Sequence, residues 1–292
     1  MTQMMQMKTK NADQRHLPDL RLIALAAALL VVHLSGCSGH RSVPDDFLAR
    51  SITVDGREYR YRVLIPRDRD PNKKVPVMLY LHGSGARGND NIAQVDGFRW
   101  AIEPQKDKID FIVVLPQCEG DTFWAAQNMS EYALAALDGS VNEFNGDGDR
   151  LYLAGFSLGG YGVWHIAAAH RGKFAGLVPV AGGVVGTYPI EPSDRDAIIP
   201  SVGDMLNAPD PYKEVAKAIG QTPVWVFHGA KDESVPVDFS RKIVKALQGN
   251  GSTNVRYTEY PGDGHQIFGK AIEEPGLLDW LVSQRLSKSG TP

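Results

Sequence analysis

Six short apolar runs, separated by stretches with helical spacing, constrain the fold of this chain more than any other feature of its sequence. Each run is continuous rather than alternating, which indicates strands that are buried on both faces. Such strands occur in a mostly parallel sheet covered by helices on both faces, so the pattern predicts one α/β domain over residues 51–292. The runs are VPVMLYL (75–81), DFIVVLP (110–116), RLYLAGF (150–156), GLVPVAG (176–182), PVWVFHG (223–229) and VRYTEYP (255–261).

A β-hairpin is predicted ahead of these runs, where ITV and REYRYRVLI flank the turn dipeptide Asp55-Gly56. Its second strand alternates at Tyr59, Tyr61 and Val63. Helices are predicted at 130–144, with Ser130 as the N-cap, and at 158–170, 237–248 and 276–286. The long interruption at 183–222 has the length of a lid or a substrate-binding insertion.

Residues 1–36 have the pattern of a lipoprotein signal peptide. Basic residues precede an apolar run at 22–32, which is shorter than the roughly 20 residues that a membrane-spanning helix needs. The segment LSGC (34–37) resembles the bacterial lipobox, so Cys37 is the predicted lipid attachment site and the cell envelope is the predicted location. The alternative is an ordinary signal peptide, or a buried helix that ends in cysteine.

The two cysteines of the chain are Cys37 and Cys118, so lipidation of Cys37 leaves a single thiol and no intrachain disulfide. Residues 37–50 are polar and rich in turn formers, which predicts a tether between membrane and domain. The formal net charge of -3 gives no electrostatic signal for nucleic acid, which is excluded as a partner.

A candidate nucleophile, Ser157, stands in the pattern G-x-S-x-G between a predicted strand and a predicted helix. Gly155 and Gly159 remove the side chains that would collide in the sharp turn of a nucleophile elbow. The pentapeptide alone is a weak signal, and its placement between strand and helix is what favours the elbow.

A nucleophilic serine needs a base and an acid, which follow it in the order Ser, Asp or Glu, His in this kind of fold. His265, after the last predicted strand, is the candidate base, because the other histidines lie in the leader, the tether, a strand end or a helix. Asp232, after the strand PVWVFHG, is the candidate acid, with Glu233 and Asp263 as rivals.

The segment LHGSGARG (81–88) fits two motifs. From Gly83 it reads G-x-G-x-x-G, a dinucleotide cradle, and from His82 it reads as a His-Gly turn of the kind that forms an oxyanion hole. A dinucleotide site needs an acid near the end of the next strand, where this chain has Gln117. The oxyanion interpretation is therefore favoured, with the backbone N–H groups of Ser84 and Leu158 as the donors.

Five segments carry a family resemblance: LHGSGARGNDN, LPQCEGDTFW, AGFSLGGYGVW, PVWVFHGAKDESVPV and VRYTEYPGDGH. Together they resemble bacterial α/β-hydrolases described as predicted peptidases or as phospholipase and carboxylesterase-like esterases, related to dienelactone hydrolase and to prolyl-oligopeptidase-like enzymes. The resemblance covers most of residues 75–286. It implies the α/β-hydrolase fold, a serine hydrolase that uses Ser157, Asp232 and His265, and a substrate cleft bordered by Trp124. Phe268 stands where members of this group tend to have Trp.

The sequence thus predicts a lipid-anchored serine esterase of the cell envelope, which acts on a small-molecule or sugar ester and needs neither metal nor organic cofactor. A serine peptidase with the same three residues is one alternative. The residues before 75 supply a hairpin but no separate domain to gate peptides, which favours esters. A non-catalytic envelope lipoprotein of the same fold is the other alternative, and the presence of all three residues argues against it.

Overall fold

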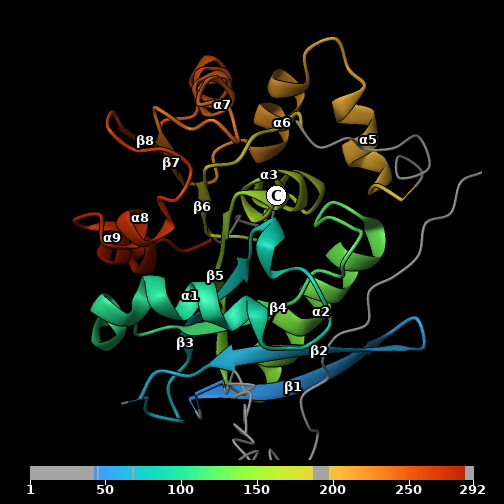
Figure 1. Cartoon of the computed structure of the whole chain (residues 1–292), viewed down its shortest axis with the longest axis vertical. Helices are drawn as coiled ribbons and strands as arrows, with labels where there is room; N and C mark the ends of the chain where they lie inside the picture. Colours follow the sequence, from blue (N-terminus) through green and yellow to red (C-terminus); the bar gives the residue numbers. More distant parts are fainter. Residues whose placement is uncertain (1–42, 45, 68, 187–196, 287–292) are drawn as a thin grey trace, which may run out of the picture. The chain divides into compact units, whose positions relative to one another are not determined.

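The computed structural model describes residues 43–44, 46–67, 69–186 and 197–286, which form an 8-stranded sheet with helices on both faces (Figure 1). Short 3₁₀ helices are labelled η. In chain order the elements are β1 (Phe47–Val54), β2 (Arg57–Leu64), β3 (Val75–Leu81), η1 (Ser84–Ala86), α1 (Ala93–Ile102), η2 (Glu103–Lys108), β4 (Ile112–Pro116), α2 (Gln127–Glu143), β5 (Gly146–Phe156), α3 (Leu158–Ala169), β6 (Gly176–Val180), α5 (Pro200–Leu206), α6 (Pro211–Ile219), β7 (Val224–Gly229), α7 (Asp238–Gly249), β8 (Val255–Tyr260), α8 (Phe268–Ile272) and α9 (Leu277–Ser283).

The strand order is β1-β2-β4-β3-β5-β6-β7-β8. β1 and β2 form the predicted antiparallel hairpin, and β2 also pairs antiparallel with β4. All later pairings, from β3 with β4 to β7 with β8, are parallel. The carboxyl ends of β3, β5, β7 and β8 therefore lie at one edge of the sheet, which is where ligands bind in open α/β folds.

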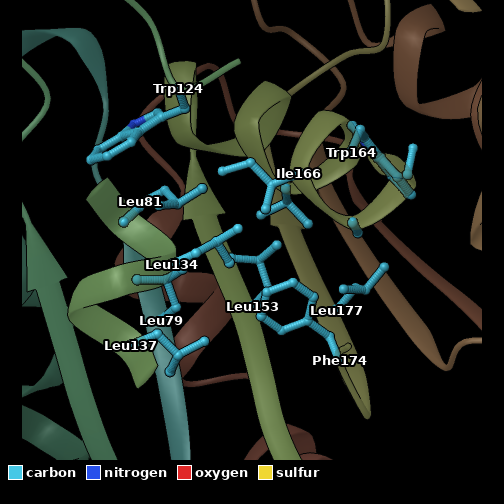
Figure 2. Packing of buried hydrophobic residues seen from close by; sticks show 14 of the residues in the cluster. Leu79, Leu81, Trp124, Leu134, Leu137, Leu153, Trp164, Ile166, Phe174 and Leu177 are labelled. Atoms are coloured by element: carbon cyan, nitrogen blue, oxygen red, sulfur yellow. The ribbon is translucent and has the colours of Figure 1, made fainter. Parts of the chain in front are cut away.

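Two apolar layers enclose the sheet, because successive side chains of a strand point to opposite faces. In β3, Leu79 and Leu81 belong to the layer under α2, α3, α6 and α7, and Met78 and Tyr80 belong to the layer under α1, α8 and α9. Figure 2 shows the first layer, where Leu134 of α2 comes close to the β3 leucines. This two-sided burial explains why the strands are continuously apolar in sequence.

Two element starts and the role of one segment differ notably from the sequence-based prediction. β1 begins at Phe47, so the last residues of the predicted tether belong to the sheet. α2 begins at Gln127, which puts Ser130 inside the helix rather than at its N-cap; extended backbone at Ala126 starts the helix instead. Within the 183–222 insertion, α6 packs against α3 and α7 and buries Val215, so this part belongs to the core and is not a lid.

The predicted signal peptide and Cys37 lie outside the described residues, as does the segment 187–196. In the part of the chain that the structure describes, no helix combines the length and the apolar character needed to cross a bilayer.

Candidate active site

Ser157 lies on the sharp turn between β5 and α3. Its backbone angles, φ 56° and ψ -115°, fall in a region that residues other than glycine rarely adopt. A Cβ atom at position 159 would lie 1.8 Å from the carbonyl oxygen of Leu81, and one at position 155 would lie 2.3 Å from that of Gly159. Glycine at both positions thus lets helix α3 start against β3 and presents Ser157 at the carboxyl edge of the sheet.

Three side chains form a continuous hydrogen-bonded set at this edge, the Ser–His–Asp chain of Ser157, His265 and Asp232. Nε2 of His265 lies 2.8 Å from Oγ of Ser157, and Nδ1 lies 2.7 Å from Oδ2 of Asp232. A carboxylate only accepts hydrogen bonds, so Nδ1 carries the hydrogen and Nε2 is the acceptor for the serine hydroxyl. This is the orientation in which a histidine removes a proton from a serine.

Asp232 is distinguished from its two rivals by burial and by hydrogen bonds. Its side chain is 0% exposed, and Oδ1 accepts hydrogen bonds from the backbone N–H groups of Ser234 (2.9 Å) and Val235 (2.8 Å). Glu233 is exposed, and Asp263 pairs at the surface with Lys270 at 2.5 Å. Neither rival forms a hydrogen bond with His265 in the described structure, so the geometry selects Asp232 as the partner of this histidine.

The loop that follows β3 approaches the nucleophile closely. A Cβ atom on Gly83 would lie 3.4 Å from Cβ of Ser157. The next residues form the three-residue helix η1, far shorter than the helix that a dinucleotide cradle opens. Among the described residues, the backbone N–H groups of Ser84 and Leu158 make no hydrogen bond. Both donors are therefore available at this end of the sheet, as the oxyanion interpretation requires.

His82 fixes the loop after β3 through two hydrogen bonds. Its Nδ1–H donates to the carbonyl oxygen of Gly83 at 2.7 Å, and its Nε2 accepts from the backbone N–H of Cys118 at 2.9 Å. Burial lowers the pKa of His82 to about 4, so the ring stays neutral at pH 7 and keeps one nitrogen as an acceptor. The two bonds tie the loop after β3 to the loop after β4.

Trp124 corrects one expectation, because it was predicted to border the substrate cleft and is instead only 1% exposed. Its Nε1–H donates to the carbonyl oxygen of His82 at 3.0 Å, and its ring meets the imidazole edge-on. In Figure 2 it lies beyond Leu81 at the end of β3. A buried indole needs a partner for its N–H, and here that partner is the backbone of the loop.

Gln117 also holds the loop, a role that the sequence did not indicate. Its Oε1 accepts from the backbone N–H of Asn91 at 2.7 Å, while its Nε2 donates to the carbonyl oxygen of Ala86 (3.2 Å) and to Oδ1 of Asp90 (2.8 Å). Arg87 adds a hydrogen bond to the carbonyl oxygen of Thr122 at 3.2 Å. A dinucleotide site would need a ribose-binding acid at position 117, and Gln117 instead holds the loop through hydrogen bonds within the protein.

A cleft of about 720 Å³ opens beside Ser157 and His265. The loop after β3 and helix α1 form one side, and Phe156 and Phe268 contribute aromatic rings, the first lying 5.0 Å from the ring of His265. Trp100 on α1 stands 71% exposed at this cleft. The described lining contains neither Lys nor Arg. The cleft therefore presents aromatic and small residues, with Gln94, Asp96 and Gln266 as further polar members of its lining.

Comparison with known proteins places this geometry in context. The model of the prolyl oligopeptidase family matches residues 124–283. An uncharacterized secreted protein of Arthroderma benhamiae is 27% identical over 259 residues, which cover 77% of this chain and 26% of that protein. Dipeptidyl-peptidase 5 of Porphyromonas gingivalis is 33% identical over 144 residues, or 44% of this chain and 20% of the peptidase. The chain thus spans about a quarter or less of the length of these two curated relatives.

Among solved structures, a thermostable esterase matches with a TM-score of 0.65 and 29% identity, covering 82% of this chain and 64% of the esterase. This match, together with the observed sheet order, confirms the α/β-hydrolase fold that the sequence predicted.

Proposed function

The chain belongs to the prolyl oligopeptidase family, and we propose that within this family it hydrolyses carboxylic esters through a covalent acyl-enzyme. It is a serine hydrolase of the esterase and peptidase type. The observation that carries the proposal is the Ser–His–Asp chain at the carboxyl edge of the sheet, beside an open cleft.

The proposed mechanism follows from the hydrogen bonds that join Ser157, His265 and Asp232. Nε2 of His265 takes the hydroxyl proton as Oγ of Ser157 attacks the ester carbonyl, and Asp232 stabilises the imidazolium that forms. The N–H groups of Ser84 and Leu158 stabilise the oxyanion of the tetrahedral intermediate. His265 then gives its proton to the departing alcohol. In the second half of the reaction His265 takes a proton from a water molecule that attacks the acyl-enzyme, and it returns this proton to Oγ of Ser157 as the acid is released.

Two observations support an ester rather than a peptide substrate. The match to the thermostable esterase covers 64% of that esterase at 29% identity, whereas the match to dipeptidyl-peptidase 5 of Porphyromonas gingivalis covers 20% of that peptidase. The cleft offers aromatic rings and small residues beside Ser157, together with the carboxylate of Asp96 on α1, and no Lys or Arg lines its described part. Such a lining suits the uncharged acyl or alcohol group of a small-molecule or sugar ester.

The direct test uses matched substrates with the same acyl group, one a p-nitrophenyl ester and the other a p-nitroanilide. We expect the ester to be cleaved with the higher kcat/KM even after the intrinsic reactivity of the two bonds is corrected for, using hydroxide rates. A dipeptidyl p-nitroanilide that is turned over as efficiently as the best ester would instead favour the peptidase alternative.

A fluorophosphonate probe separates both enzymes from a non-catalytic lipoprotein of the same fold. We expect stoichiometric labelling of the wild-type protein and none of Ser157→Ala. Turnover should also disappear in Ser157→Ala while its far-ultraviolet circular dichroism stays unchanged, because residual catalysis would come only from the oxyanion donors and from binding. Retained esterase activity in this variant would contradict the assignment of the nucleophile.

We also propose that residues 1–36 are a signal peptide and that Cys37 carries the lipid that anchors the enzyme in the cell envelope. The lipobox-like segment LSGC supports this proposal. The tether is then residues 37–46, since the sheet starts at Phe47.

A further inference from the structure

A second buried histidine, His228, lies directly behind the acid of the Ser–His–Asp chain. It is the penultimate residue of β7, and its side chain is 0% exposed. Its Nε2 lies 2.9 Å from the carbonyl oxygen of Val235 and 3.2 Å from Oδ2 of Asp232. That carboxylate oxygen is the one that accepts the hydrogen bond from His265, so the two imidazoles meet at a single atom.

The partners of His228 define which of its nitrogens carries a hydrogen. A carbonyl oxygen only accepts, so Nε2 must be the donor to Val235. Nδ1 lies 2.6 Å from Oγ of Ser240 and is then the acceptor for that hydroxyl. Burial lowers the pKa of His228, so the ring is neutral at pH 7. The result is one Nε2–H group that donates to the carbonyl oxygen of Val235 and also lies 3.2 Å from Oδ2 of Asp232, within range of an electrostatic contact.

We propose that His228 is a positioning residue that holds the Asp232 carboxylate for His265 and partly offsets its negative charge through the Nε2–H group, which lies 3.2 Å from Oδ2. This proposal rests on the proposed hydrolase function. Oδ1 of Asp232 is already fixed by the backbone N–H groups of Ser234 and Val235, while among the described residues Oδ2 contacts the two histidines only. His228 therefore acts on the oxygen that touches the base.

Other charges near His228 do not replace this interaction. Strand β8 places Glu259 opposite His228, but Glu259 is held by Arg241 of α7 through contacts of 2.9 and 2.6 Å. The remaining titratable neighbours are Asp232 and His265 themselves. On this side of His228, α7 presents the hydroxyl of Ser240, and the loop after β6 presents the carbonyl oxygen of Gly182, neither of which is charged.

The first test needs no substitution. Ring-nitrogen NMR of uniformly ¹⁵N-labelled protein reports the tautomer of each histidine, and we expect His228 to be the neutral Nε2–H tautomer from pH 6 to pH 9. The Nδ1–H tautomer would overturn the proposal, because Nε2 would then have no hydrogen to direct at Asp232. This outcome leaves the hydrolase function untouched, since that is measured separately by probe labelling and by Ser157→Ala.

The second test compares two amides at position 228. Glutamine places its amide nitrogen near the position of Nε2, and asparagine places it near that of Nδ1, so only His228→Gln keeps a donor for Asp232. We expect His228→Asn to lower kcat/KM by about tenfold or more and to move the acidic limb of its pH profile up by about half a pH unit. The limb moves up because a carboxylate without this donor holds the His265 imidazolium more strongly.

His228→Gln should recover the wild-type limb and most of the lost rate. The matched control is His165→Asn, because His165 is also buried and its Nε2 bonds a carbonyl oxygen, that of Val184, at 2.8 Å. This control should lose stability without moving the limb. If His228→Asn behaves like His165→Asn, or if His228→Gln shifts the limb as far as His228→Asn does, the role of His228 is structural and the proposal fails.

Discussion

The backbone strain at Ser157 can be measured independently of catalysis. Residues held in sparsely populated regions of φ and ψ cost on the order of 1–3 kcal/mol, and Ser157 has φ 56° with a side chain. Glycine adopts positive φ readily, so Ser157→Gly should release this strain, whereas Ser157→Ala should retain it. Both variants lose the hydroxyl and its hydrogen bond to His265, so the difference between them isolates the Cβ atom.

The expected magnitude follows from three terms. Release of strain contributes about 2 kcal/mol in favour of glycine. The greater freedom of glycine in the unfolded chain opposes this by about 0.4–1 kcal/mol. Loss of the buried Cβ opposes it by about 0.8 kcal/mol, since Ser157 is 5% exposed. Ser157→Gly should therefore be at least as stable as Ser157→Ala.

A helical position supplies the control. Ala246 lies inside α7 and is partly buried, and its replacement by glycine should lower the free energy of unfolding by about 1 kcal/mol. The assay is urea unfolding at 25 °C, with the slope of the transition compared between variants. If glycine is less stable than alanine by the same amount at position 157 as at position 246, Ser157 is not strained and the argument is wrong.

Three further predictions concern the acid, the elbow and the anchor. Asp232→Asn should lower kcat/KM by about a thousandfold or more. Asp263→Asn should lower it by less than about tenfold, roughly 1.4 kcal/mol. An inactive Asp263→Asn variant together with an active Asp232→Asn variant would reverse the assignment of the acid. Gly159→Ala should fail to yield folded protein by circular dichroism, because its Cβ meets the backbone of β3, whereas Gly97→Ala, with open space around its Cβ, should fold normally. Cys37→Ser should move the native-host protein from the detergent phase to the aqueous phase in Triton X-114 partitioning, and wild-type protein that already partitions into water would contradict lipidation.

The sequence predicts the central strands β3, β4, β6 and β7 well because burial on both faces leaves a direct trace in each of them. Every predicted apolar run overlaps a strand of the structure, with ends that differ by up to four residues, as at the start of β5. The start of β1 is missed because its residues alternate between half-buried and exposed after Phe47, so the strand lacks a continuous apolar run. The start of α2 is missed because Ala126 sets it through backbone conformation, which carries no capping side chain.

The candidate site is predictable to the extent that it follows chain order. Ser157 and His265 could be named from strand ends and neighbouring glycines, but the choice among Asp232, Glu233 and Asp263 depends on which carboxylate is buried facing His265. The bracing contacts were beyond sequence reasoning. Spacing along the chain gives no sign that Trp124 would donate to a backbone 42 residues away.

The two readings of LHGSGARG are separated in the end by hydrogen-bond capacity at position 117. The dinucleotide reading needs a carboxylate there, and a carboxylate only accepts. In this structure the residue is buried, and it must accept from the backbone of Asn91 while it donates to the carbonyl oxygen of Ala86 and the carboxylate of Asp90. A glutamate could make the first bond only, and it would place a second negative charge beside that of Asp90, where like charges repel. The amide is thus the group that lets the same glycine pattern form a fixed loop beside Ser157 rather than a phosphate cradle.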